Sequence, residues 1–353
     1  MIPRLKKIFS ELKQEKLEGL LLNSAANISY LTKYLSRDSY LVISSQGNIY
    51  ITDSRYTEEA KINLKGLATI KKINSSLFKT IALACEELGI KRVGFEERYL
   101  AFAEYQKIKS NLHKDVALIP THSLVERLRQ VKEEGELKKI RQAIKITLRA
   151  FEFIQDFLKP GIKEIEVAAE LEHFIRYNGG CTSAFEIIVA SGPNAAYPHH
   201  ITSQKKLRNH EPVLIDMGVD FSGYKSDLTR TFFLGKITFL FRKVYNTVKE
   251  AQERAFRQIK PGAGVSKIDT AARQYITQKG YGRCFGHNLG HGVGLEVHEA
   301  PSISAKENNT LESGMVFTVE PGIYLPGKFG VRIEDIALVT QQGLEILSGV
   351  INK

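Results

Sequence analysis

The stretch VLIDMGVDFSGYKSDLTRTF, residues 213–232, contains two apolar segments that each carry an acid. Residues 213–215 predict a strand that ends in Asp216, and a second strand runs back from Asp227. In a hairpin whose turn is centred on 222–223, residues that face each other have numbers that sum to 445. The numbers of Asp216 and Asp227 sum to 443, so the two are displaced from direct pairing by two residues. They are therefore diagonal neighbours on one face, within the ~7–8 Å reach of such pairs. The stretch predicts an antiparallel hairpin that presents two carboxylates side by side.

Three further residues of this chemistry, His291, Glu320 and Glu334, follow in short apolar or glycine-rich segments. Four carboxylates brought together without cations would repel one another and resist ionisation. Two divalent ions supply four positive charges against the four negative ones, and a metal ion makes water a nucleophile at neutral pH. The set therefore predicts a dinuclear metallohydrolase. Its expected ligands are Asp216, Asp227, His291, Glu320 and Glu334.

The segment GHNLGHGVGLEVHE, residues 286–299, holds three histidines. His287 and His291 stand four residues apart, as in the helical zinc motif HExxH. Asn288 occupies the glutamate position, however, and the flanking glycines disfavour a helix. We reject that motif and expect a loop whose glycines allow close approach to a ligand. His298, seven residues after His291, is expected at the end of a short strand, where it would touch a substrate.

The segment VRIED, residues 331–335, predicts a buried strand close to the end of the chain. The two-residue period of a strand places Arg332 and Glu334 on the same face. An arginine beside a ligand carboxylate would orient it. We therefore expect Arg332 to support the metal site.

The length of 353 residues favours two domains. Residues 1–122 alternate helical and strand patterns and predict a smaller α/β domain. Residues 123–353 predict long helices outside a curved antiparallel sheet, so that the fold class of the whole is α+β. The element ranges that we expect are helices Arg4–Glu15, Ser75–Leu88, 123–157 with an interruption at Gly135, Glu164–Tyr177, Lys243–Ile259 and Lys267–Lys279, and strands Gly19–Leu22, Tyr40–Ser44, Asn48–Thr52, Arg92–Glu96 and Ile187–Ala190.

Composition argues against several other classes of protein. No run approaches ~18 apolar residues, and the N-terminus lacks a signal-peptide core, so we expect a cytoplasmic protein that does not contact membranes. The three cysteines form no CxxC pair and predict neither a disulfide framework nor a zinc-thiolate site. The net charge of +11 comes from scattered lysines without an accompanying motif, so we expect no nucleic-acid partner.

Taken together, the motifs resemble those of the pita-bread metallopeptidases, a family that includes Xaa-Pro aminopeptidases, Xaa-Pro dipeptidases (prolidases) and methionine aminopeptidases. The matching segments are Ser191–His199, Asp216–Gly218, Ser226–Arg230, His291–Glu299, Val319–Tyr324 and Arg332–Asp335. The resemblance runs from about Arg129 to the C-terminus, and Asn27–Thr32 extends it into the N-terminal, creatinase-like domain. Methionine aminopeptidases usually lack such a domain. Its presence therefore favours the proline-specific branch.

The resemblance implies a role for each matching residue. Asp216 corresponds to the bidentate ligand of one metal ion, Asp227 and Glu334 to carboxylates that bridge both ions, and His291 and Glu320 to the remaining ligands of the second. His199 corresponds to the histidine that stabilises the tetrahedral intermediate, and His298 to one that contacts substrate near the scissile bond. His200 departs from the glycine common at its position, and we assign the role to His199. The family is usually dimeric, which predicts a homodimer.

The function expected from the resemblance is that of an Xaa-Pro aminopeptidase acting on peptides with proline at the second position. A hydroxide bridging the two ions would attack the carbonyl carbon before the proline, Glu320 would shuttle a proton, and His199 would stabilise the oxyanion. Oxygen-rich ligation favours manganese, with cobalt, zinc or iron as other possibilities. Two alternatives stay open: a prolidase acting on dipeptides, and a non-catalytic binding module of the same fold.

Overall fold

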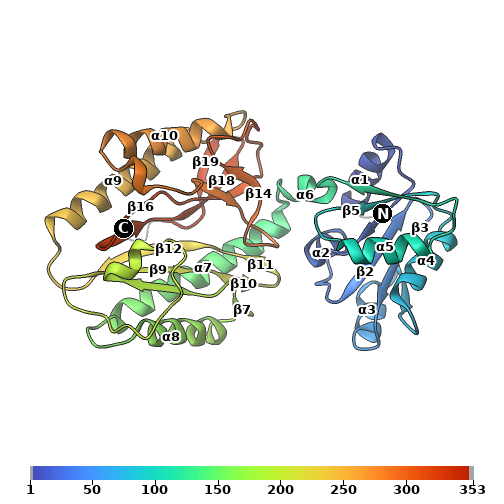
Figure 1. Ribbon diagram of the computed structural model, residues 1–353, viewed down its shortest axis with the longest axis horizontal. Helices are drawn as coiled ribbons and strands as arrows, with labels where there is room; N and C mark the ends of the chain where they lie inside the picture. The colour runs from blue at the N-terminus through green and yellow to red at the C-terminus, as the bar shows by residue number, and fades with distance from the viewer. Residues whose placement is uncertain (1–2, 350–353) are drawn as a thin grey trace. The chain divides into compact units, whose positions relative to one another are not determined.

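The structure, a computed structural model that describes residues 3–349, divides into two compact units, Met1–Arg129 and Gln130–Lys353 (Figure 1). The boundary thus falls after Arg129, whereas the sequence placed it after residue 122. Helix α6 (Leu124–Arg129) accounts for the difference, because Leu124 and Val125 are buried and Arg127 pairs with Glu11 of the N-terminal unit at 3.0 Å. Within the described part of the chain, no helix is both long and apolar enough to cross a bilayer.

The N-terminal unit contains a six-stranded mixed sheet in the order β4-β3-β2-β1-β5-β6. Its strands are β1 (Gly19–Leu22), β2 (Ser39–Ser44), β3 (Gly47–Thr52), β4 (Thr69–Lys72), β5 (Arg92–Glu96) and β6 (Ala117–Thr121). Its other helices are α1 (Pro3–Gln14), α2 (Ala25–Thr32), α3 (Thr57–Asn63), α4 (Leu77–Glu87) and α5 (Phe102–Asn111). Strands β1, β2 and β3 pair antiparallel, and the remaining pairs are parallel. The six elements with an expected range, α1, α4, β1, β2, β3 and β5, agree with it to within two residues, whereas α2, α3, α5, β4 and β6 were not predicted.

The second unit carries two pairs of helices, α7 (Glu134–Phe157) with α8 (Glu164–Tyr177), and α9 (Phe239–Phe256) with α10 (Val265–Gln278). The predicted interruption of the helical stretch 123–157 is present, but it lies at residues 130–133, between α6 and α7, and Gly135 itself is in the first turn of α7. The helix begins earlier, where the Glu136 side chain accepts a hydrogen bond from the Glu133 N–H at 2.9 Å. Helix α9 also begins before the expected Lys243, because the Thr238 side chain accepts from the Phe241 N–H and caps it.

The strands of this unit are β7 (Thr182–Ser183), β8 (Ile188–Ser191), β9 (Pro212–Met217), β10 (Val219–Phe221), β11 (Tyr224–Lys225), β12 (Leu228–Phe233), β13 (Gly290–Gly292), β14 (Glu299–Ile303), β15 (Val316–Val319), β16 (Gly322–Leu325), β17 (Phe329–Arg332), β18 (Asp335–Thr340) and β19 (Gly343–Ile346). All strand pairs of this unit within residues 3–349 are antiparallel. The sheets have the orders β12-β9-β8, β11-β10-β7, β14-β13-β15-β18-β19 and β16-β17.

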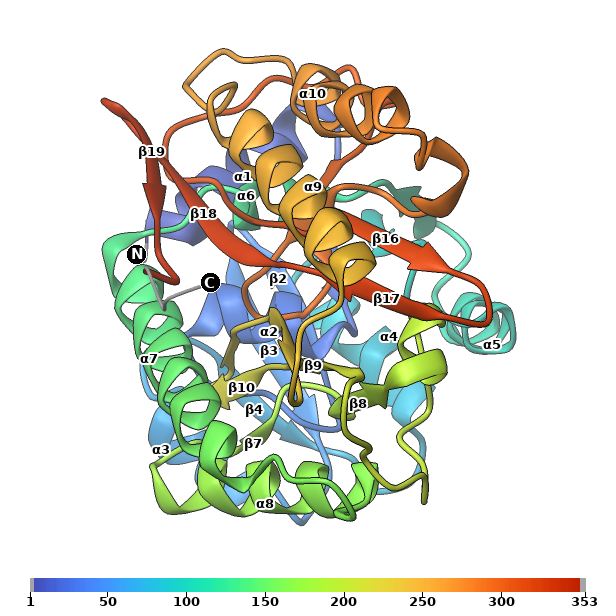
Figure 2. The ribbon, with the colours of Figure 1, turned by 90° about the vertical axis from the view of Figure 1, so that its left-hand side faces the viewer.

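Each helix pair covers its own group of strands, and the strands lie between the two pairs (Figure 2). Ile140 and Phe151 of α7 are fully buried in one core with Val189 and Ile215 of β8 and β9. Val248 of α9 and Ile268 of α10 are fully buried in a second core with Phe317, Val331 and Ala337 of β15, β17 and β18. This arrangement confirms the predicted α+β class with a pita-bread domain. Polar residues on the strands that meet between the two cores are therefore held on rigid elements.

Candidate metal centre

The hairpin predicted from residues 213–232 forms with the expected register. Asp216 on β9 stands opposite Thr229 on β12, so that paired residues sum to 445. Asp227, two residues before Thr229, is the diagonal neighbour of Asp216 on the same face. Gly218 permits this close pairing, because a Cβ atom there would lie 2.0 Å from the Ser226 carbonyl oxygen.

Glycines also bring the third ligand candidate into place. His291 lies in the short strand β13, between Gly290 and Gly292. A Cβ atom on Gly290 would lie 1.9 Å from the carbonyl oxygen of Thr318 in β15, and one on Gly292 would lie 2.2 Å from the Ala300 carbonyl oxygen. The backbones approach so closely that no side chain fits. As predicted, this segment is not a helix.

The two glutamates stand where the chain leaves a strand. Glu320 directly follows β15, and Glu334 lies between β17 and β18. The expected single strand 331–335 is therefore wrong: β17 ends at Arg332 and the chain crosses into another sheet before β18 begins at Asp335. Glu334 is held by β12, since its N–H donates to the Thr229 carbonyl (3.2 Å) and its Oε2 accepts from Thr229 Oγ1 (2.7 Å).

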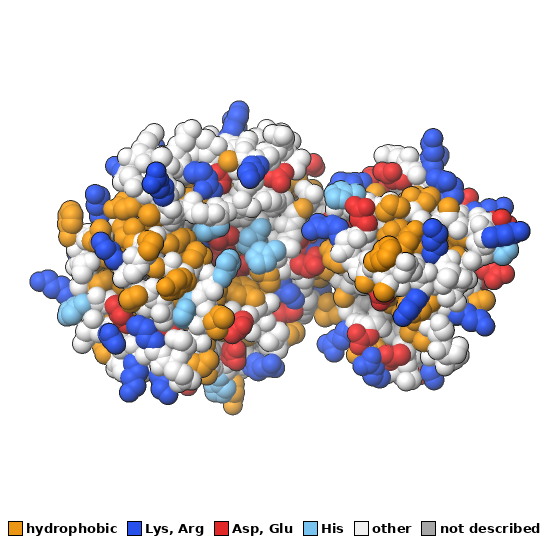
Figure 3. All heavy atoms as spheres, viewed as in Figure 1, with side chains coloured by type: hydrophobic (Ala, Val, Ile, Leu, Met, Phe, Trp, Pro, Cys, Tyr) orange, Lys and Arg blue, Asp and Glu red, His pale blue; other side chains and the backbone are white. Residues whose placement is uncertain are grey.

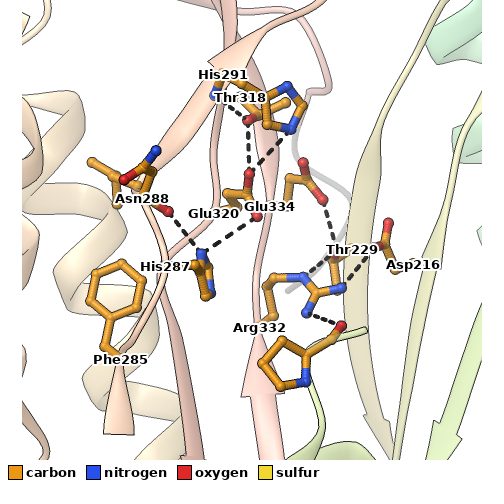
Figure 4. A network of polar contacts seen from close by, with 12 residues as sticks. Asp216, Thr229, Phe285, His287, Asn288, His291, Thr318, Glu320, Arg332 and Glu334 are labelled. Atoms are coloured by element: carbon orange, nitrogen blue, oxygen red, sulfur yellow. Dashed lines mark hydrogen bonds and ion pairs between the residues drawn. The ribbon is translucent and has the colours of Figure 1, made fainter. Parts of the chain in front are cut away.

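The five candidate ligands meet in one place. Three overlapping groups have donor atoms within 4.8 Å of one another: Asp216, Asp227 and Glu334; His291, Glu320 and Glu334; and Asp227, His291 and His298. His291 Nε2 lies 3.3 Å from Glu320 Oε1 and 3.6 Å from Asp227 Oδ2. Figure 4 shows Glu320, Glu334, His291 and Asp216 turned toward the same space, and Figure 3 shows histidine and acidic side chains gathered on one face of this unit.

The carboxylates of this cluster are buried close enough to raise one another's pKa values. Burial raises the pKa of Asp227 well above its ordinary range, and the charges of Glu334 and Asp216 raise it further. The pKa of Glu334 is raised in the same way, by burial and then by Glu320 and Asp216. Within the described residues, Asp216 Oδ1 is buried and has no hydrogen-bond partner. A buried, unsatisfied oxygen among like charges fits a divalent cation, and the donor set can hold one.

An imidazole partly compensates the charge on one side of the cluster. Burial alone would raise the pKa of Glu320, but the hydrogen bond and charge of His291 outweigh it and lower the pKa. Burial would likewise lower the pKa of His291, whereas Glu320 raises it. Each of these two groups therefore stabilises the charged form of the other.

Arg332 holds the carboxylate of one candidate ligand, Asp216. Its Nη2 donates to Asp216 Oδ2 at 2.7 Å, while Nε donates to Thr229 Oγ1 at 2.9 Å (Figure 4). Its Nη1 donates to Tyr324 Oη at 2.9 Å and to the Pro198 carbonyl at 3.3 Å. One oxygen of Asp216 is thus held by Arg332, and the other has no hydrogen-bond partner among the described residues. The pKa of Asp216 is still raised, because burial outweighs the arginine.

His287 joins the site although the sequence analysis assigned it no role. Its Nε2 lies 3.0 Å from Tyr324 Oη, and its Nδ1 lies 4.0 Å from Glu320 Oε2 (Figure 4). Burial lowers the pKa of His287 and raises that of Tyr324 to about 12. The four-residue spacing between His287 and His291 could have indicated that both lie in the site. The sequence analysis discarded this indication when it rejected the zinc motif.

Three further histidines were considered in the sequence analysis, and each has different surroundings. The rings of His298 and His291 are 4.3 Å apart between centroids, and His298 is exposed, directly before β14 rather than at the end of a strand. Burial, then the charges of His291 and, more weakly, His199, lower the pKa of His298. His199 is exposed, whereas His200 Nε2 lies 3.0 Å from the buried Glu164 Oε2. The structure thus gives the adjacent imidazoles different surroundings.

Comparison with known proteins defines the class. The chain belongs to the Metallopeptidase family M24, whose model matches residues 138–341, and the Creatinase/Prolidase N-terminal domain matches residues 4–131. These matches confirm the predicted resemblance to the pita-bread metallopeptidases. The chain is therefore a metallopeptidase preceded by a creatinase-type domain.

Individual peptidases are similar to this protein over nearly its whole length. The chain is 40% identical to the uncharacterized peptidase YqhT of Bacillus subtilis (strain 168), over 97% of this chain and 96% of that protein. The structure of the Xaa-Pro dipeptidase from Bacillus anthracis matches with a TM-score of 0.95 and 39% identity, covering 99% of this chain and 98% of the other. That of the X-Pro aminopeptidase from Thermotoga maritima matches with a TM-score of 0.89 and 36% identity, covering 97% and 99%.

Proposed function

We propose that this protein is a dinuclear metal-dependent exopeptidase that hydrolyses the bond between an N-terminal residue and a following proline, as an Xaa-Pro aminopeptidase does. The observation that carries the proposal is the convergence of Asp216, Asp227, His291, Glu320 and Glu334 in a partly buried cluster with an unsatisfied oxygen. Membership of the Metallopeptidase family M24 supports the reaction class. The names of the similar structures support specificity for Xaa-Pro substrates.

The five residues would hold the ions in two overlapping sets. Asp216 belongs to the set at the arginine side, His291 and Glu320 to the opposite set, and Asp227 and Glu334 bridge them. When bound, divalent ions supply an activated water at neutral pH and polarise the substrate carbonyl. Arg332 keeps Asp216 in place throughout, because it is itself held by Thr229 and Tyr324.

The surrounding residues handle protons and charge. Glu320 would accept a proton from the attacking water and pass it to the leaving nitrogen. The contacts of its two oxygens with different imidazoles, His291 and His287, support this role. His199 would donate a hydrogen bond to the oxygen on which negative charge develops. His298, exposed beside His291, would contact the substrate near the scissile bond.

The metal that we propose is manganese, because four of the five ligands are carboxylates and hard oxygen donors suit it. Cobalt, zinc and iron are the other candidates. We further propose a homodimer in the cytoplasm that binds neither nucleic acid nor membrane. Elution volume on a calibrated sizing column tests the dimer, and salt-sensitive retention on DNA would contradict the absence of nucleic-acid binding.

A second candidate is an Xaa-Pro dipeptidase, favoured by the name of the Bacillus anthracis structure. The two activities differ in whether the site has room for residues beyond the proline. Assays of the manganese-loaded protein on Xaa-Pro dipeptides and on matched tripeptides with proline second separate them. Cleavage of the tripeptides supports the aminopeptidase, cleavage of dipeptides alone supports the dipeptidase, and cleavage of neither contradicts the proposal.

A non-catalytic binding module of the same fold is the third candidate. Such a module has no need of a complete ligand set, whereas all five donors are present and within reach of one another. Metal analysis of the purified protein distinguishes the two cases. A protein that takes up no divalent ion would favour the binding module.

A further inference from the structure

Glu164, the first residue of α8, is a fully buried carboxylate outside the metal cluster. Burial alone would raise its pKa, but hydrogen bonds from Ser203, Ser191 and His200 outweigh burial and lower it. The side chain is therefore an ionised acceptor in the interior of the protein. Such a charge is retained only where several donors surround it.

All these donors come from one segment, residues 191–203. Glu164 Oε1 accepts from the N–H and the hydroxyl of Ser191, both at 2.7 Å, and from Asn194 Nδ2 at 3.0 Å. Oε2 accepts from the hydroxyl of Ser203 at 2.6 Å and from its N–H at 3.2 Å, and it lies 3.0 Å from His200 Nε2. One carboxylate therefore ties together the beginning, the middle and the end of the segment.

His199 belongs to this segment, and the residues on both sides of it are anchored. The Pro198 carbonyl accepts from Arg332 Nη1 at 3.3 Å, and the His200 ring contacts Glu164. The His199 side chain itself is exposed. Among the described residues no hydrogen bond holds its ring, so the anchors on Pro198 and His200 are the contacts that can limit where it lies. A catalytic group must be held close to its productive geometry.

We propose that Glu164 is a positioning residue, which acts through His200 and the 191–203 segment to hold His199 toward the metal cluster. His200 stands where a glycine is common in the family. In this proposal, its side chain links the backbone next to His199 to the buried carboxylate. The inference rests on the proposed function in one respect, the action of His199 on the reacting carbonyl.

Replacement by glutamine tests this role with little change in shape. The Ser191 N–H, the Ser203 N–H and Asn194 Nδ2 can only donate, so the amide NH₂ of a glutamine would face donors. Glu166→Gln is the matched control, because Glu166 lies in the same helical turn, is exposed, and accepts only from the Lys163 N–H among the described contacts.

We expect Glu164→Gln to lower kcat by about 10- to 100-fold, the loss that follows misplacement of a catalytic group by about 1 Å, with bound metal and KM little changed. Glu166→Gln should behave as the original protein. The double variant Glu164→Gln/His199→Ala should be no slower than His199→Ala alone, because both changes remove the same contribution. His200→Ala should also lower kcat, and His200→Gln, which keeps a donor, should recover part of the loss.

Hydrogen exchange of residues 192–203 gives a readout that does not depend on activity. We expect faster exchange in Glu164→Gln and unchanged exchange in Glu166→Gln. If the original protein cleaves no Xaa-Pro peptide, the proposed function fails, and exchange still decides whether Glu164 orders the segment. Unaltered exchange, unaltered kcat, or a double variant whose losses multiply would overturn the inference. His200→Ala, at a partly exposed position, tests the same link if Glu164→Gln does not fold.

Discussion

The two carboxylate oxygens of Asp216 differ in their hydrogen bonding, and this difference bears on whether Asp216 can bind a metal ion. Oδ2 is fixed by Arg332 at 2.7 Å, while Oδ1 is buried without a hydrogen-bond partner in the described structure. An arginine bound to both oxygens would occupy a lone pair on each of them, whereas here Oδ1 keeps all of its lone pairs. The contact with Arg332 therefore orients the carboxylate and leaves it able to bind a metal ion.

Asp227→Asn should abolish both metal uptake and hydrolysis, because Asp227 joins the two sets of donors. The metal-free variant should be at least as stable as the metal-free original, since one of four mutually repelling carboxylates has been removed. Metal content, turnover and thermal unfolding with and without manganese measure these effects. Normal turnover by the variant would refute the assignment.

The candidate ligands could be predicted from sequence because each lies in a short apolar or glycine-rich segment, where an acid or imidazole requires a partner. The proximity of Asp216 and Asp227 followed from counting the hairpin register. The partner of Arg332 did not follow, because the chain changes sheets directly after it. The contact of His287 with Tyr324 also depends on tertiary packing that no local pattern records.

At the scale of secondary-structure elements, strand β13 positions His291 only because it can lie against β15 without side chains between them. Gly290→Ala places a methyl group on the Thr318 carbonyl, a backbone atom that cannot move aside. We expect a loss of stability of about 1–3 kcal/mol and weaker metal binding. Gly286→Ala is the control, because a Cβ atom there meets nothing within 4 Å. Equal stability and metal affinity in the two variants would contradict this account.

Strand β5 of the N-terminal unit ends in Glu96, a buried carboxylate that accepts from the N–H groups of Asn23 and Ser24 at the start of α2. Burial raises its pKa from an ordinary value of 4.5 to about 7, despite these hydrogen bonds. The folded state therefore binds the proton more tightly than the unfolded state. Its contribution to stability is fully present below pH 4.5 and is lost as the pH rises toward 7.

Glu96→Gln should remove this dependence on pH, which amounts to roughly 3 kcal/mol at 1.36 kcal/mol per pH unit. Denaturant unfolding of the full chain between pH 4.5 and 8, followed by a probe in the N-terminal unit, measures it. Glu86→Gln, an exposed acid in the same unit, is the control and should keep the original slope. A slope unchanged by Glu96→Gln would show that another group is responsible.

Most helices, but fewer than half of the strands, followed from hydrophobic periodicity and from turn residues. The predicted bounds of β1, β5 and α8 coincide with those observed. The differences have local causes. Capping side chains started α7 before Gly135 and α9 before Lys243, and propensity alone does not record such caps. The division of residues 331–335 between two sheets depends on the pairing of β17 with β16 and of β18 with β15.

For the whole molecule, the fold brings candidate ligands from distant parts of the sequence to a place between two cores. The carboxylate repulsion there means that ions which bind the folded state should raise its stability, by about 2.7 kcal/mol at one hundred times the dissociation constant. Thermal unfolding should therefore shift upward as manganese is added. An unfolding temperature that does not respond would argue against a preformed site.

The most direct test of the central claim is to measure bound metal and peptidase activity on the same preparation. We expect full activity on Xaa-Pro peptides at two divalent ions per chain, loss of activity on chelation, and recovery when manganese is restored. A fully active preparation that contains no bound ion would contradict the account.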